Sequence, residues 1–97
     1  MNDRQRRSRW AEVFSSLASE PRLHIVELLS EDPVQCQEIL GQLELSQPAV
    51  SYHLAKLERA GVLQKERQGT RNCYRLREEL RTLIRGVMKE EGSWNAQ

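Results

Sequence analysis

A short stretch near the middle of the chain carries hydrogen-bonding side chains and lacks acidic ones. Between Ser46 and Ala55 there are Gln, Ser, Tyr and His side chains but neither Glu nor Lys. A helix of 3.6 residues per turn would turn its apolar residues inward. The opposite face would then carry Pro48, Ser51, Tyr52, Ala55 and Arg59, flanked by Gln47 and Lys56. Such donors and acceptors can pair with base edges in the ~12 Å major groove of DNA, for example Gln with adenine. The pattern predicts a recognition helix; the alternative is an ordinary solvated helix face.

Positive charge is concentrated in particular segments, although the formal net charge is only +1. Residues 64–77 carry five basic residues against one acidic residue, Glu66, and four arginines lie within residues 4–9. Residues 31–60, in contrast, carry two basic and five acidic residues. Basic segments of this kind are the footprint expected of a phosphate-binding surface. A solubilising surface is the alternative.

The elements that would position these residues follow from apolar periodicity and capping residues. The first helix is expected over residues 4–18. Ser19 is expected to cap a second helix, with Pro21 in its first turn, where a missing N–H group has no effect. A third, short helix is expected from the i, i+3, i+4, i+7 spacing of Cys36, Ile39, Leu40 and Leu43.

The second half of the chain predicts a helix, a hairpin and a last helix. Ser46 is expected to cap the fourth helix by bonding the amide of Ala49, and Gly61 is expected to end it. Residues 62–67 and 72–77, joined through residues 68–70, predict a hairpin with a charged tip. The order ααααββα indicates a mainly α (α+β) winged helix-turn-helix, a single domain over residues 1–97 with a frayed tail at 93–97.

Residues 45–76, LSQPAVSYHLAKLERAGVLQKERQGTRNCYRL, closely resemble the recognition helix and wing of ArsR/SmtB-type repressors. Residues 17–29, LASEPRLHIVELL, resemble the second helix of that family, and the resemblance extends over roughly residues 10–88. It implies a sequence-specific transcriptional repressor that binds a palindromic operator in double-stranded DNA. On this resemblance the DNA surface includes Ser46, Gln47, Ser51 and His53, and flanking phosphates or the minor groove are reached by Arg67 and Arg71 of the wing.

Two residues leave details open. Glu44 stands where the family often has Gly, and a left-handed corner there would cost roughly 1 kcal/mol. We therefore expect a slightly different turn. His53 lies at the border of the inward face, so it either packs and hydrogen-bonds within the protein or reads bases.

Two apolar stripes bracket a domain that residues 20–76 already close. They consist of Trp10, Val13, Phe14 and Leu17 in the first helix and of Leu80, Leu83, Ile84 and Val87 in the last. A core this small cannot bury both stripes completely, so we expect a homodimer with a twofold interface built from residues 1–18 and 78–92. Two recognition helices would then lie roughly 34 Å apart, one turn of DNA. The alternative is that both helices pack against their own monomer.

The sequence lacks the ligand patterns of the metal sensors in this family. Gln35, Cys36 and Gln37 replace the Cys-x-Cys of arsenic sensors, and residues 78–97 contain no His for zinc or nickel. A metal needs three or four convergent ligands. The candidate nitrogen and sulfur ligands are His24, His53, Cys36 and Cys73. They are scattered over four elements, so we expect no metal site and no cofactor.

The two cysteines are too few and too scattered for a disulfide framework. On the third helix, Cys36 is expected to be a small buried hydrophobe. Alternation with Tyr74 and Leu76, both expected to point inward, places Cys73 outward, beside the guanidinium groups of Arg71 and Arg75, which favour a thiolate. One alternative function is therefore a thiol-redox-responsive regulator that uses Cys73 or Cys36.

Other classes of protein fit the sequence less well. There is no Ser-His-Asp grouping, phosphate-binding Gly loop or paired carboxylate set, so we expect no enzyme. No apolar run approaches the ~20 residues of a membrane helix, and MNDRQRRSRW lacks the apolar segment of a secretory signal. We expect a cytoplasmic protein without membrane contact. A winged-helix module that binds protein and no longer binds DNA is the other alternative, and no effector is specified.

Overall fold

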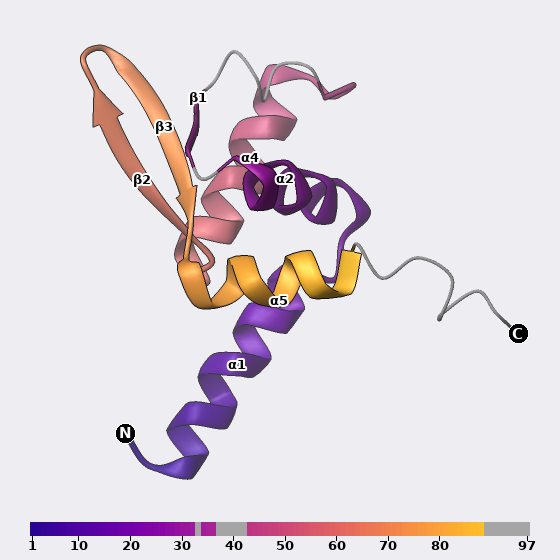
Figure 1. Ribbon diagram of the computed structural model, residues 1–97, viewed down its shortest axis with the longest axis vertical. Helices are drawn as coiled ribbons and strands as arrows, with labels where there is room; N and C mark the ends of the chain where they lie inside the picture. Colours follow the sequence, from indigo (N-terminus) through magenta and orange to yellow (C-terminus); the bar gives the residue numbers. More distant parts are fainter. Residues whose placement is uncertain (33, 37–42, 89–97) are drawn as a thin grey trace, which may run out of the picture.

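The computed structural model describes residues 1–32, 34–36 and 43–88, and Figure 1 shows their arrangement. In chain order the elements are α1 (Asp3–Leu17), α2 (Glu20–Glu31), β1 (Val34–Cys36), α4 (Gln47–Arg59), β2 (Leu63–Gln68), β3 (Arg71–Leu76) and α5 (Glu78–Met88). The predicted winged helix-turn-helix fold is confirmed. No helix among these described residues is long and apolar enough to cross a membrane.

Side-chain caps define where two of the helices begin. The Ser19 hydroxyl accepts a hydrogen bond from the amide of Arg22 at 3.4 Å, and the Ser46 hydroxyl accepts one from Ala49 at 3.2 Å. Each bond satisfies a first-turn N–H group that has no partner within the helix. Just beyond α4, Gly61 has a φ of +81°, a left-handed conformation that glycine adopts without a Cβ clash. The predicted caps and the predicted end of α4 are confirmed.

The prediction that Cys36 belongs to the apolar stripe of a third helix is wrong, because residues 34–36 form strand β1. This strand pairs with β3, whose edge would otherwise present unpaired backbone groups. Ile39 and Leu40, which belong to the same prediction, lie outside the described residues. Leu43 is buried in the core.

The turn ahead of α4 does not use a left-handed residue. Glu44 is among the described residues, and none of these except glycines has a positive φ. The chain therefore avoids the roughly 1 kcal/mol that a left-handed Glu would cost, as expected from the departure at this position.

The sheet has three antiparallel strands in the order β1-β3-β2. Strands β2 and β3 pair along their whole length, beginning with Leu63 opposite Leu76. Gly69 and Thr70 form the connection, and of the two only Gly69 has a positive φ, +64°. A two-residue loop with Gly first is typical of the type II′ turn, whose twist matches that of the strands.

One core of buried side chains joins the helices to the sheet. Its centre includes residues without exposed surface from α2, from α4 and from the start of the hairpin: Ile25, Val26, Leu29, Leu57 and Val62. Helices α1 and α5 add four residues that we expected at a dimer interface: Val13, Leu17, Leu80 and Ile84. Their burial needs no second copy of the chain.

The rest of the two apolar stripes behaves differently. Trp10 is partly buried and packs against the core. Phe14, Leu83 and Val87 are 55%, 39% and 62% exposed. Each stripe is therefore divided between a face that closes the monomer and a face that meets solvent.

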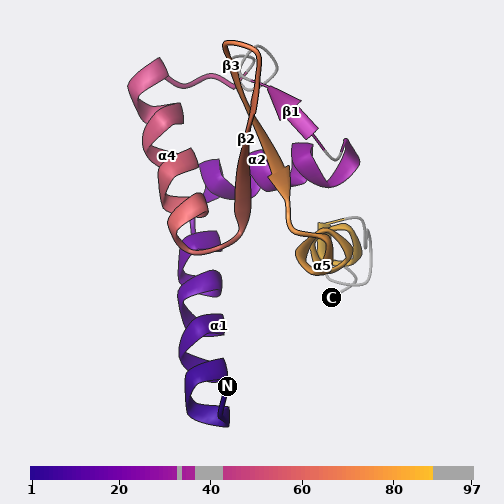
Figure 2. The same cartoon turned by 90° about the vertical axis from the view of Figure 1, so that its left-hand side faces the viewer.

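Figures 1 and 2 both place the hairpin tip and the first turn of α4 at one end of the molecule. The N-terminal half of α1 projects from the opposite end in both views, and α5 lies between these two ends. The fold thus separates the polar face of α4 and the hairpin from the start of α1.

Candidate nucleic-acid interface

Helix α4 presents the outward face that its sequence predicts. Val50, Leu54 and Leu57 are buried. The predicted contact residues on the other side are exposed, and they are Ser46, Gln47, Pro48, Ser51, Tyr52 and Lys56. The first turn contains no acidic residue, so the positive end of the helix dipole faces solvent without a compensating carboxylate. Such an end favours an anionic partner.

Tyr52 is the largest exposed side chain on this face. Its ring is 55% exposed, and the Lys56 Nζ lies 5.7 Å from the ring centroid. On the other side, the His53 imidazole meets Tyr52 edge-on with centroids 5.3 Å apart. The cation–π contact and the edge contact hold the phenol between two polar neighbours, with its hydroxyl available to a partner.

His53 is half-buried and contacts α2 directly. Its Nδ1 lies 3.1 Å from Nη1 of Arg22. Desolvation by burial, followed by the charge of Arg22, lowers the pKa of His53 below its ordinary value. The packing interpretation therefore has a specific partner. Sequence periodicity missed Arg22 because the contact joins residues 31 positions apart.

The hairpin carries its cations in two distinct settings. Arg67 and Arg71 are exposed and lie at or beside the last residue pair before the turn. Arg75, nearer the core, donates from Nε to the Glu66 carboxylate at 2.7 Å. This ion pair offsets one positive charge on the hairpin.

The arginines of α1 lie in two settings relative to the hairpin. The first turns of α1 lie at the end opposite the hairpin tip (Figures 1 and 2). Arg6 also pairs with Asp3 of its own helix. Arg9, in contrast, comes close to the base of the hairpin: its Nη2 and the Nε of Arg77 lie 3.8 Å and 4.0 Å from the point where a Cβ on Gly61 would stand.

The expected positions of both cysteines are wrong. Cys73 has no exposed surface and forms a disulfide bond with Cys36 of β1. Alternation along β3 predicts an exposed Cys73 only if solvent lies beside the hairpin. At this position β1 lies beside β3, with Cys36 opposite Cys73. Within the part of the chain that the structure describes, no three His, Cys, Asp or Glu residues gather as metal ligands.

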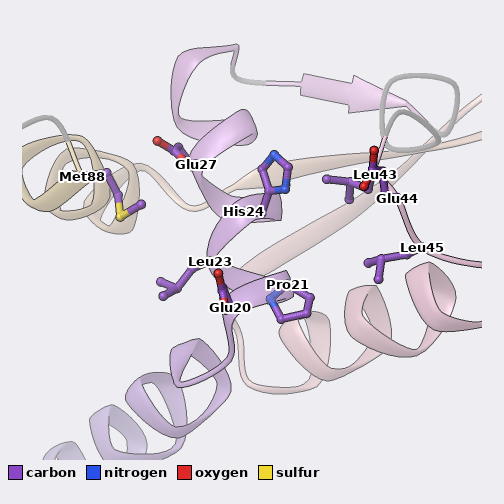
Figure 3. Close-up of a pocket in the computed structure, with 9 residues that line it drawn as sticks. All are labelled: Glu20, Pro21, Leu23, His24, Glu27, Leu43, Glu44, Leu45 and Met88. Carbon is purple, nitrogen blue, oxygen red and sulfur yellow. The ribbon is translucent and has the colours of Figure 1, made fainter.

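A cavity of about 690 Å³ lies beside the start of α4, and none of the predicted contact residues lines it. Figure 3 shows Glu20, His24 and Glu27 of α2 on its wall, with Leu45 from the segment ahead of α4 and Met88 from α5. Sequence pattern does not predict this hollow, because its walls come from three separate segments.

The chain has relatives among regulatory proteins. Residues 19–65 match the family described as bacterial regulatory protein, arsR family. The arsenic resistance transcriptional regulator ArsR1 of Pseudomonas putida is 36% identical over 87 residues, which cover 84% of this chain and 68% of that protein. The arsenical resistance operon repressor of Escherichia coli is 44% identical over 66 residues, 67% of this chain and 56% of that repressor.

The fold also matches a solved structure. That structure is a homodimeric winged helix-turn-helix DNA-binding domain from Mycobacterium bovis, a possible ArsR-family transcriptional regulator. It matches with a TM-score of 0.79 at 27% identity, covering 91% of this chain and 84% of that one. Sequence and fold therefore agree: this chain belongs to the ArsR family of bacterial regulatory proteins and is a winged helix-turn-helix, DNA-binding transcriptional regulator.

Proposed function

We propose that this protein binds one short palindromic operator as a homodimer and represses transcription there. The observation that carries the proposal is the position of α4 and the hairpin. The acid-free face of α4 is exposed, and its first turn lies at the same end of the molecule as the basic hairpin tip (Figures 1 and 2). A helix that enters the major groove and a hairpin that reaches the flanking backbone need that arrangement.

Within this surface, sequence reading and anchoring fall to different residues. Gln47, Ser51 and Tyr52 carry neutral donors and acceptors on the exposed face of α4, which suits base edges. Arg67 and Arg71 carry permanent positive charge near the hairpin tip, which suits phosphates or a narrow minor groove. His53 takes a supporting role, because Arg22 already occupies its Nδ1.

The second copy of the chain covers the exposed parts of α1 and α5. Phe14, Leu83 and Val87 present large apolar side chains to solvent in the single chain. Apolar area removed from water contributes roughly 25 cal/mol per Å², and a twofold interface uses the same patch on both copies. The similar Mycobacterium bovis domain is homodimeric. Twofold symmetry then presents two recognition helices to half-sites roughly 34 Å apart.

A chromosomal operator places the working protein in the cytoplasm. The same assignment gives it no membrane partner and no catalytic role. The regulated genes follow from the operator once its sequence is known.

Selection of bound duplexes from a randomised DNA library, with the full chain, tests the proposal. We expect an inverted repeat whose half-sites are about one helical turn apart, with a footprint that covers both. Binding without any sequence preference would contradict the operator, and a failure to bind any duplex would favour a protein-interaction module.

A further inference from the structure

Cys36 and Cys73 occupy directly opposed positions on neighbouring strands. The register of β1 against β3 pairs these two residues, and a disulfide bond joins them. Their Cα atoms are 3.9 Å apart. Cys73 has no exposed surface, whereas Cys36 is partly exposed. Cys36 is thus the more accessible residue of the pair.

The bond lies midway along the wing, because Cys73 is opposite Glu66, in the third residue pair from the turn. Strand β1 pairs only with residues 73–75 of β3, whereas β2 pairs with all six residues of β3. In the described residues, the hairpin beyond Cys73, including Arg67 and Arg71, therefore consists of β2 and β3 alone. On the other side of the bond, Cys36 precedes the α4 cap Ser46 by ten positions. The disulfide therefore joins the middle of the wing to a strand that precedes the recognition helix in the sequence.

We propose that Cys36 and Cys73 form a reversible thiol–disulfide switch that sets the affinity of this regulator for DNA, an inference that rests on the proposed function. Proteins that bind chromosomal DNA work in a compartment that keeps thiols reduced, where disulfides are usually transient and redox-sensing. A pair brought together by strand register is suited to form its bond, because the two residues are opposite each other on neighbouring strands.

Hydrogen peroxide or an organic hydroperoxide supplies the oxidising equivalents. The Cys36 thiolate attacks one peroxide oxygen; an S–O bond forms, the O–O bond breaks, and the departing oxygen takes a proton and leaves as water or alcohol. The Cys73 sulfur then attacks the Cys36 sulfur, so that the S–S bond forms and the S–O bond breaks, releasing a water molecule. The two thiols lose two electrons and two protons in total. A small dithiol reverses the reaction by attacking the exposed Cys36 sulfur and leaves as its own disulfide.

The oxidised form is the tighter DNA binder. Strand β1 has three residues, and strand pairs this short are marginal in water without further support. The covalent link fixes β1 on β3 and so fixes the middle of the wing, two residue pairs from its turn, before DNA arrives, which removes part of the ordering that binding would otherwise require. We expect the oxidised form to bind a selected operator about tenfold more tightly than the reduced form, the size expected from ordering the backbone of about one residue.

The experiment compares oxidised and reduced full-length protein on DNA. Duplexes are first selected from a random library with each form separately. Thiol alkylation and mass spectrometry then count free thiols after stoichiometric hydrogen peroxide and again after dithiothreitol, and operator affinity is measured at both points. We expect two thiols to be lost and regained, with the affinity change following them.

Cys36→Ser is the matched control, because Cys36 is partly exposed. The variant also retains both methionines, so an effect of peroxide on methionine would still appear in it. Its affinity should be the same before and after peroxide. If the serine variant does not fold, Cys36→Val provides a side chain that strands favour. Cys73→Ser is a poorer choice, since Cys73 is fully buried.

Three results would overturn the switch. The first is that no intramolecular disulfide forms after peroxide. The second is that the two forms bind the selected operator with equal affinity, and the third is that the reduced form binds it more tightly. Failure of both forms to select any sequence would instead overturn the proposed function and the regulatory role with it, even where the alkylation assay still detects the disulfide.

Discussion

Arg22 of α2 donates a hydrogen bond from Nη1 to Nδ1 of His53 on α4 across 3.1 Å. Because a guanidinium has no acceptor and keeps its proton, the imidazole must accept at Nδ1 and carry its proton on Nε2. The same guanidinium donates from Nε to the backbone carbonyl of Ser16. One side chain therefore ties together the end of α1, the start of α2 and the recognition helix.

This contact predicts that moderate acid weakens the fold through His53. Burial and then the Arg22 charge lower the pKa of His53 from 6.5. Below pH 6.5 the unfolded chain binds a proton here more readily than the folded chain does. The contribution of neutral His53 is thus fully present above pH 6.5, and the free energy of unfolding decreases as the pH falls through the folded pKa.

Urea unfolding of the wild type and of His53→Asn, between about pH 5 and 8, measures this effect. Asparagine keeps an acceptor for Arg22 but does not titrate, so the variant should lose the His53 part of the pH slope. His24→Asn serves as the control, because His24 is exposed and the slope should survive. Identical slopes in the wild type and His53→Asn would show that the contact has no such effect.

Base reading and phosphate anchoring should respond differently to substitution. Gln47→Ala should cost about 1–3 kcal/mol at one operator position and leave binding to random DNA unchanged. Arg67→Ala should weaken binding to every sequence and reduce the salt slope by about one. Arg7→Ala is the matched control and should leave both quantities unchanged, because Arg7 belongs to the N-terminal half of α1, which projects from the opposite end of the molecule (Figure 1).

Affinities over a salt series on operator and random duplexes check both expectations. If Gln47→Ala and Arg67→Ala bind the operator as the wild type does, α4 and the hairpin are not the DNA surface.

Charge placed on the exposed apolar patch should separate the two copies. Leu83→Glu combined with Val87→Glu changes side chains that are 39% and 62% exposed, so each chain should still fold. The double variant should nevertheless be monomeric, because burying unpaired carboxylates in an interface is strongly unfavourable. Thr82→Glu, on an exposed position of the same helix, should remain dimeric. Ile84→Asp should unfold the monomer itself, since Ile84 is 4% exposed.

Sedimentation at micromolar concentration measures the outcome, with circular dichroism to verify folding. A wild-type chain that sediments as a monomer would refute dimerisation outright.

The cap of α4 should contribute measurably to stability. Ser46→Ala removes the acceptor for the Ala49 amide and should lower the free energy of unfolding by about 1 kcal/mol. Ser46→Asn retains a capping oxygen and should cost much less. Denaturant titration distinguishes the two variants, and equal losses in both would mean that the cap is not the cause.

Much of the fold could be predicted because its signals are local. Ser19 and Ser46 cap helices within three residues of themselves, and Gly61 and Gly69 take the positive φ that a helix end and a tight turn require. The outward face of α4 follows from a single helical period. Each of these features depends on a few neighbouring residues, so sequence pattern is sufficient to predict them.

The features that sequence pattern missed depend on distant pairing. Val34–Cys36 has three residues, too few for strand alternation to be distinguished from helical spacing. Cys36 and Cys73 are 37 positions apart, and only the register of β1 brings them together. The division of the α1 and α5 stripes into buried and exposed parts likewise depends on how the helices dock, which periodicity does not specify.

The two-residue turn at Gly69 and Thr70 allows the reach of the wing to change independently of the rest of the fold. No atom lies within 4 Å of the point where a Cβ on Gly69 would stand, so the tip borders open space. Strands extend roughly 3.4 Å per residue, and side chains return to the same face every second residue. Lengthening both strands by two residues would therefore move the tip about 7 Å outward while every existing side chain kept its face. Regulators built on this domain can accordingly contact a longer or shorter stretch of DNA beside their operators without any change in the hydrophobic core.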